Sequence, residues 1–148
     1  MKTLALVLLA LLFAAGCGSA VQNHTAGIRS VALAHRAGFM AVTDARTAAL
    51  ERVAEPHAPG SLERGAAVDA EARRWAPAGS AFDALREALF LWLDAVAVAE
   101  SEESAWDAVG PIVARVLRLL RDASRIATGL GVDVPAVPDL SGLIGGTL

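Results

Sequence analysis

The sequence has little of what builds disulfides, nucleic-acid sites or β-rich folds. Its 148 residues include one cysteine, no tyrosine, three tryptophans and four phenylalanines. A single cysteine excludes an internal disulfide, so the fold depends on packing alone. The formal net charge of −3 lacks the basic excess that nucleic-acid binding normally requires, and we expect no nucleic-acid partner. No segment alternates apolar and polar residues for long, so we expect no strands.

What the chain does have is apolar residues, at 55 %, with 20 % charged residues. That composition excludes a disordered chain, and the length suits one domain. Part of the apolarity lies in residues 4–15, LALVLLALLFAA, which carry no charge. About twelve residues are too few to span a bilayer core of about 30 Å. Because Lys2 precedes this run and small residues follow it, residues 1–16 are predicted to be a secretory signal peptide.

The stretch Ala14-Ala15-Gly16-Cys17 resembles the lipobox of bacterial lipoproteins, although that motif most often has leucine where Ala14 stands. The resemblance covers residues 1–19 and implies cleavage between Gly16 and Cys17. It also implies diacylglycerol on the Cys17 sulfur and an acyl chain such as palmitate on the new amino terminus. Gly18 after the cysteine implies the outer membrane, facing the periplasm of a bacterial cell envelope. The alternative is an ordinary signal peptide that leaves Cys17 a free thiol.

Three stretches after the motif have apolar residues at helical spacing, every three or four positions. The first spans 26–53, with Thr25 as its N-cap, and ends at the Pro56–Gly60 break. The second spans 62–100 after Ser61. The third spans 104–129, with Ser104 as cap, and ends at glycines 129 and 131. The predicted core positions are seven residues apart on each helix. They are Val68, Trp75, Phe82, Leu89 and Val96, then Trp106, Val113, Leu120 and Ala127.

Pro77 lies inside the second stretch, in the sequence Trp75-Ala-Pro-Ala-Gly-Ser80 that ordinarily marks a turn. The seven-residue spacing of apolar residues continues across this stretch without a shift, which favours one long helix kinked near Pro77. The alternative is two helices, over 62–76 and 80–100. Short connections favour antiparallel neighbours. We therefore expect an all-α, elongated antiparallel three-helix bundle with a kinked long central helix, following a cleaved N-terminal signal helix.

The predicted organisation has four parts: the signal peptide 1–16, a lipidated tether 17–25, the helical bundle domain 26–131 and a flexible C-terminal tail 132–148. The tail carries two prolines and several glycines, too many for a helix.

No group of residues in the sequence suggests a catalytic or metal site, and apart from the lipid on Cys17 we expect no cofactor. His24 falls in the tether and His57 in the proline-rich corner; His35 lies on the apolar stripe without a ligand partner at helical spacing. Several carboxylates lie near the connection between the second and third predicted helices, which we call the second corner. They suit a solvated helix cap rather than a cation site. They are Asp94, Glu100, Glu102, Glu103 and Asp107.

A basic ridge on the third helix is the best candidate for a surface contact: Arg115, Arg118, Arg121 and Arg125. It suits anionic headgroups or a polyanionic partner, but a solvated face with Asp122 paired to Arg118 is the simpler interpretation. The three tryptophans lie at positions that the apolar spacing assigns to the core.

The leading hypothesis is therefore a lipid-anchored, non-enzymatic helical scaffold that binds another envelope protein. Two alternatives remain: a phage-type lysis accessory lipoprotein, similar to outer-membrane spanins, and a small-molecule carrier with a ligand near Trp75, Trp92 and Pro77.

Overall fold

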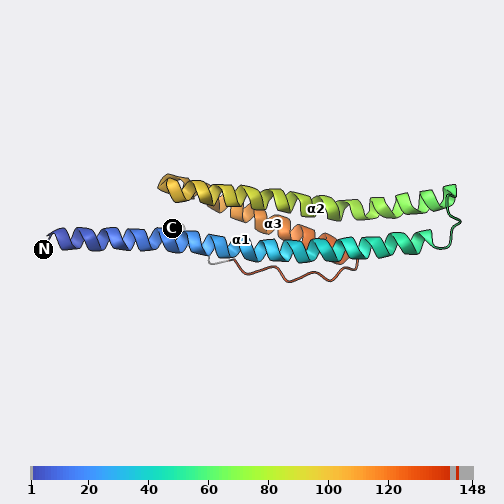
Figure 1. Ribbon diagram of the computed structural model, residues 1–148, viewed down its shortest axis with the longest axis horizontal. Helices are drawn as coiled ribbons and strands as arrows, with labels where there is room; N and C mark the ends of the chain where they lie inside the picture. The colour runs from blue at the N-terminus through green and yellow to red at the C-terminus, as the bar shows by residue number, and fades with distance from the viewer. Residues whose placement is uncertain (1, 141–142, 144–148) are drawn as a thin grey trace.

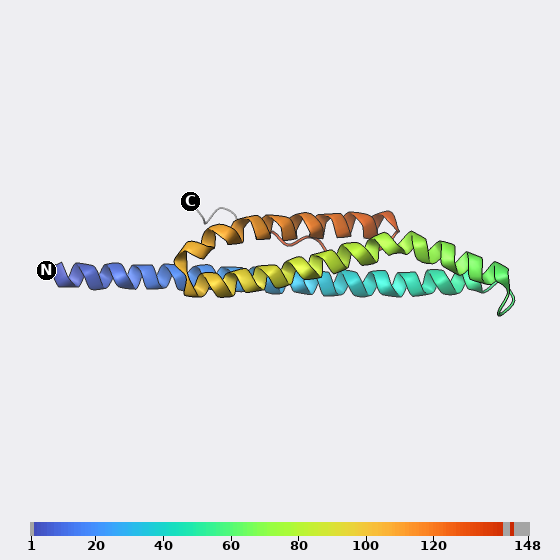
Figure 2. The ribbon, with the colours of Figure 1, turned by 90° about the horizontal axis from the view of Figure 1, so that it is seen from above.

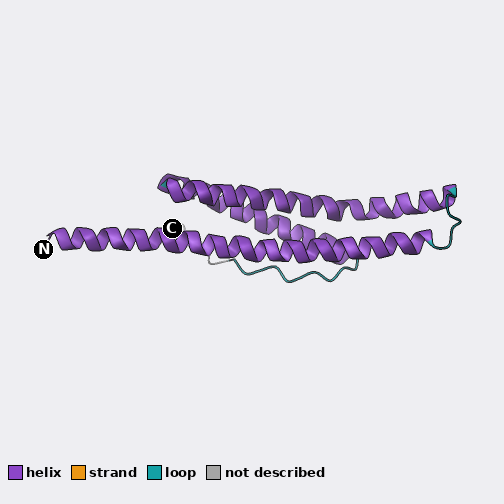
Figure 3. Ribbon diagram, in the orientation of Figure 1, coloured by secondary structure: helices purple, strands orange, loops and turns teal. Residues whose placement is uncertain are grey.

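The computed structural model describes residues 2–140 and 143, with side chains from Ala20 onward except that of Glu103. The helices in chain order are α1 (Lys2–Ala54), α2 (Leu62–Ser101), the 3₁₀ turn η1 (Glu103–Ala105) and α3 (Trp106–Gly129). The described part of the chain contains no strand, as Figure 3 shows. The prediction of an all-α fold with three helices packed against each other is confirmed.

The helix α2 is the centre of the arrangement, because it packs along both α1 and α3. Figure 1 shows α1 running the length of the molecule, α2 returning beside it and α3 reversing direction again. The helices α1 and α3 touch each other much less. The N-terminal part of α1 extends past the corner between α2 and α3 (Figures 1 and 2). The molecule is therefore elongated, with the α2–α3 corner at the end nearer the N-terminus.

The core follows the predicted heptad phases except at Val68 and Trp106, which are half-buried. The α2 residues at those phases are buried from Trp75 to Ala99, and those of α3 from Val109 to Ala127. Trp92, Leu85, Val109, Val113 and Val116 are among the largest fully buried side chains. Burying apolar area stabilises a fold by roughly 25 cal/mol per Å², so the aligned stripes are the main source of stability.

The ends of the helices agree with the sequence in two places and differ in two. The Ser61 hydroxyl accepts a hydrogen bond from the Arg64 amide at 3.2 Å, which confirms it as the N-cap of α2. Gly131, at φ +81°, ends α3 in a conformation that glycine adopts without strain. Thr25 is not a cap, because α1 continues through it and its hydroxyl donates to the Val21 carbonyl. Ser104 is not a cap either, because η1 leads directly into α3.

Pro77 lies within a single continuous α2. The structure therefore has the one-helix alternative rather than helices over 62–76 and 80–100. Proline has no amide hydrogen, so the Arg73 carbonyl, four residues earlier, lacks its usual helical donor. Ala78 and Trp75 on either side are both buried. Packing on this face holds the helix together across the proline.

The segment after α3 runs back along the helices without regular secondary structure over 132–140. Val132 and Leu140 are buried, and Val137 packs against the core. Figure 2 shows the segment lying between α3 and α1. A Cβ atom built on Gly38 of α1 would lie 3.9 Å from Val134 Cγ1. These described residues of the expected tail thus pack against the helices, with Val134 close to α1.

Candidate functional site

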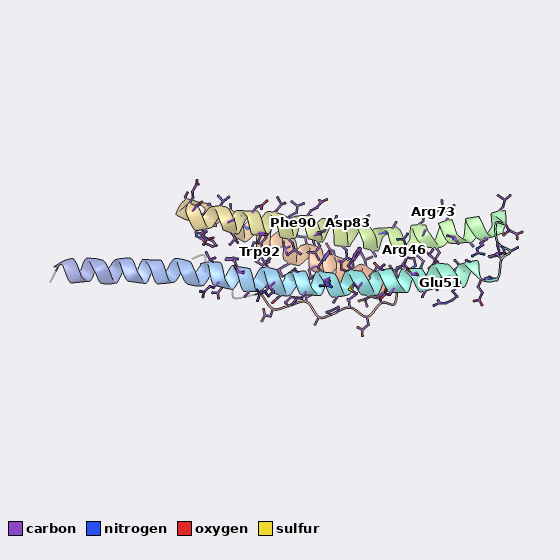
Figure 4. All side chains as sticks on the ribbon, viewed as in Figure 1. Arg46, Glu51, Arg73, Asp83, Phe90 and Trp92 are labelled. Atoms are coloured by element: carbon purple, nitrogen blue, oxygen red, sulfur yellow. The ribbon has the colours of Figure 1, made fainter. Side chains whose placement is uncertain are left out.

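A buried histidine joins all three helices at the end of the bundle that carries the α2–α3 corner. His24 of α1 is 5 % exposed, the one buried polar or charged residue among those described. Its Nδ1 accepts a hydrogen bond from Trp92 Nε1 of α2 at 3.3 Å. Its ring also stacks on Trp106 of α3, with centroids 5.4 Å apart. Figure 4 shows Trp92 on the α1 side of α2.

The environment of His24 favours the neutral ring. Burial lowers its pKa, because desolvation disfavours the charged imidazolium. In the neutral ring Nδ1 is the acceptor for Trp92 and the proton is on Nε2. A proton added to Nδ1 would face the Trp92 N–H, also a donor. The cluster of His24, Trp92 and Trp106 is therefore a packing and hydrogen-bonding centre that depends on a neutral histidine.

We expected His24 in a polar tether, and this is wrong: it is a buried residue of α1. A signal was present in the sequence. His24 lies four residues before Ile28 and seven before Val31, so it continues the apolar stripe backwards by one turn. The neighbouring Gln22, Asn23 and Thr25 concealed it, because polar residues on the other faces of a helix resemble a linker.

The other two histidines lie away from this cluster. His35 is partly buried and its Nε2 is 3.0 Å from the Phe82 carbonyl oxygen, which accepts from the ring N–H. Its ring also lies near Phe39 and Phe82. His57 is in the α1–α2 loop. The structure thus confirms His35 as a satisfied packing residue, as its place on the stripe predicts.

Gly16 and Cys17 lie within α1, in the stretch 2–19 whose side chains are outside the described ones. His24 follows Cys17 by seven residues. At 1.5 Å per residue these positions are about 10 Å apart along the helix axis. The residues expected as a tether, 17–25, are part of the same helix. The lipidation candidate is therefore joined to the buried cluster by about two turns of continuous helix.

The four arginines of the predicted ridge are all exposed on α3. We expected Asp122 to pair with Arg118, but it pairs with Arg125 instead. The reason is geometric: positions three residues apart on a helix are neighbours just as positions four apart are. Arg115, Arg118 and Arg121 have no ion pair within the part of the chain that the structure describes.

The carboxylates of the second corner stay apart. Asp94, Glu100, Glu102 and Asp107 are exposed. Among the described residues, no three histidine, cysteine or acidic side chains gather where they could hold a metal ion.

A pocket of about 350 Å³ opens between α1 and the C-terminal segment. It is lined by Asn23, Ala26, Gly27, Ser30, Asp139, Leu140 and Leu143. It is not at Trp75 or Pro77, where the alternative of a small-molecule carrier places its ligand, and both Trp75 and Trp92 are buried in the core.

Within residues 2–140 and 143, no helix combines the length and apolar character needed to cross a membrane. The chain matches no protein-family model, no curated protein and no solved structure.

Proposed function

We propose that this protein is a lipid-anchored component of the bacterial cell envelope, a non-enzymatic helical scaffold that binds another envelope protein. The observation that carries the proposal is the sequence Ala14-Ala15-Gly16-Cys17 after an apolar run that begins beside Lys2. In this proposal residues 1–16 form a signal helix that is removed, and Cys17 carries diacylglycerol and an N-acyl chain. Two or more acyl chains give stable anchoring where one does not.

The geometry of α1 supports a scaffold held close to the membrane. A flexible tether would let the bundle move freely about its anchor. A helix continuous from Cys17 to His24, with His24 packed against Trp92 and Trp106, instead holds the bundle about 10 Å from the lipidated residue. The long axis of the bundle then points away from the membrane, and the α2–α3 corner lies near its surface. Gly18 in place of aspartate points to the outer membrane.

We also propose that α2 is kinked at Pro77. A kink at Pro77 would let α2 follow both of its neighbours, because proline removes one helical hydrogen bond and its ring displaces the preceding turn.

The test is fractionation of cells that express the wild-type chain or Cys17→Ser, followed by crosslinking of each fraction. We expect the wild-type chain in the outer-membrane fraction with a crosslinked envelope protein, and the variant displaced from that fraction. Ser19→Ala is the matched control, because it alters a neighbouring small residue and leaves the motif intact. A Cys17→Ser chain that remains in the outer-membrane fraction like the wild type would contradict the proposal.

A further inference from the structure

The segment that follows α3 sets an aliphatic residue against the bundle at every third position (Figure 2). We call residues 132–140 together with Leu143 the strap. Pro135, Ala136 and Asp139 are exposed, whereas the aliphatic residues between and after them are buried or half-buried. These inward residues are Val134, Val137, Leu140 and Leu143. A spacing of three is that of an extended polyproline II chain, so one side of the strap faces the helices and the other faces water.

Side chains rather than backbone groups hold the strap in place. Within the described chain, no backbone hydrogen bond joins residues 133–139 to a helix. Val134 packs against the part of the core that contains Phe82, and Leu140 belongs to the part that contains Trp92. Apolar packing of this kind is not directional. Another extended chain with the same spacing of aliphatic residues could therefore take the place of the strap.

The side of α1 under the strap is shaped to receive it. A Cβ atom on Gly27 would lie 2.5 Å from Leu143 Cδ1, and one on Gly38 would lie 3.9 Å from Val134 Cγ1. Gly27 therefore has no room for a side chain while Leu143 is in place. Because these glycines are three turns of helix apart, they lie within about 20° of each other around α1. We call this side of α1, from Asn23 to Gly38, the strap surface.

The strap does not fill the space between itself and α1. The pocket of about 350 Å³ described above lies between Asn23, Gly27 and Ser30 of α1 and the end of the strap at Leu140 and Leu143. Unfilled space beside packed atoms forfeits dispersion contacts. A segment with larger side chains at this end would recover those contacts, and it would then bind the strap surface more tightly than the strap does.

We propose that the strap surface is where the scaffold binds its envelope partner, and that an extended segment of the partner, aliphatic at every third residue, replaces the strap there. The strap is then an intramolecular competitor of the partner. For the existence of a partner the inference rests on the proposed function. The surface itself can be measured with a peptide, whether or not Cys17 carries lipid.

The size of the competition follows from the attachment of the strap to α3. A segment joined by a short connection acts at an effective concentration of about 1 mM. With a dissociation constant of about 100 μM for the same segment as a free peptide, the strap covers the surface in about nine molecules of ten. It then raises the apparent dissociation constant of a competitor about tenfold. A partner that binds moderately well is therefore able to displace it.

The test measures binding of a fluorescent peptide of residues 132–148 by anisotropy. The full chain is purified from the cells that express it in a mild non-ionic detergent. In the release variant Val137→Asp/Leu140→Asp, two carboxylates replace side chains that pack against the bundle, so the strap should detach. The matched control Ala136→Asp adds the same group at the exposed neighbouring position. We expect the release variant to bind the peptide at least about tenfold more tightly than the wild type and the control do.

A second peptide tests whether the aliphatic spacing matters. With serine in place of its four inward aliphatic residues, the peptide should bind the release variant at least about tenfold more weakly. Trp92 gives a further signal, because its Cη2 atom lies 3.1 Å from the Cβ position on Gly27 that Leu143 also approaches. Tryptophan emission should shift to the red in the release variant and return when the first peptide is added.

Three results would overturn the inference. The first is a release variant that binds the peptide no more tightly than the wild type, and the second is a serine peptide that binds equally well. The third is loss of helix content in the release variant by circular dichroism, because the strap would then be an inseparable part of the core.

In cells, the release variant should also crosslink more of the envelope partner than the wild type does, since its surface is no longer covered. Equal crosslinking of the two chains would overturn this inference and leave the proposed function standing.

Discussion

His24 and Trp92 are 68 residues apart in the chain, and the histidine Nδ1 accepts the indole N–H at 3.3 Å inside the bundle. With Trp106 stacked on the same ring, this contact joins α1, α2 and α3 at the end of the molecule nearest Cys17. It makes α1 a structural member of the bundle from two residues before the start of the helix that the sequence predicts at residue 26.

Replacing His24 with alanine should lower the free energy of unfolding by about 2–3 kcal/mol, because Trp92 would keep a buried, unpaired N–H beside a new cavity. Urea unfolding followed by circular dichroism measures the change. His57→Ala, in the α1–α2 loop, is the control and should have little effect. Equal effects of the two substitutions would show that the cluster does not stabilise the fold.

The free energy of unfolding should depend on pH through the same residue. Burial gives His24 a lower pKa in the folded chain than in the unfolded one, so the unfolded chain binds more protons around pH 6. Stability is therefore complete above about pH 6.5 and falls as the pH drops below it. His24→Phe should remove this part of the dependence and His57→Gln should retain it. A wild-type chain equally stable at pH 5 and pH 7.5 would argue against a neutral buried His24.

Gly38 of α1 lies close against the ring of Phe82 of α2. A Cβ there would lie 2.9 Å from two atoms of the Phe82 ring, which is itself buried. Gly38→Ala should therefore destabilise the bundle by about 1–3 kcal/mol through overpacking. At Gly65 of α2 nothing lies within 4 Å of an added Cβ. Gly65→Ala should instead stabilise by up to about 1 kcal/mol, because alanine favours helix. Thermal unfolding distinguishes the two, and a stabilising Gly38→Ala would mean that the helices are further apart at this point.

Pro77→Ala measures what the proline costs. The substitution restores a donor to the Arg73 carbonyl in an exposed part of α2, and we expect a gain of about 1–3 kcal/mol in the free energy of unfolding. The control Ala76→Gly, at the adjacent exposed position, should destabilise by about 1 kcal/mol. A loss of stability in Pro77→Ala would show that packing around Trp75 and Phe82 requires a bend that alanine does not supply.

The helices and most of the core could be predicted from the sequence, because the seven-residue spacing of residues such as Leu89 and Val113 indicates which face of a helix is buried. His24 could not be predicted as confidently, since one polar residue at a stripe position resembles a linker when its neighbours are polar too. The packing of Val132 and Leu140 could not be predicted at all. The spacing of apolar residues in an extended segment does not indicate which helices it packs against.

The ion pairs on the surface could also be predicted only in part. Sequence spacing identified the arginines of α3 as one ridge but gave two equivalent partners for Asp122, and Arg125 rather than Arg118 is the one it contacts.

The central claim is that the mature protein begins at a lipidated Cys17. Intact mass spectrometry of the protein extracted from the membrane fraction tests it most directly. The account predicts a chain that starts at Cys17 and carries the added mass of diacylglycerol and one acyl chain. A chain that retains residues 1–16, or one that starts at Cys17 with an unmodified thiol, would contradict it.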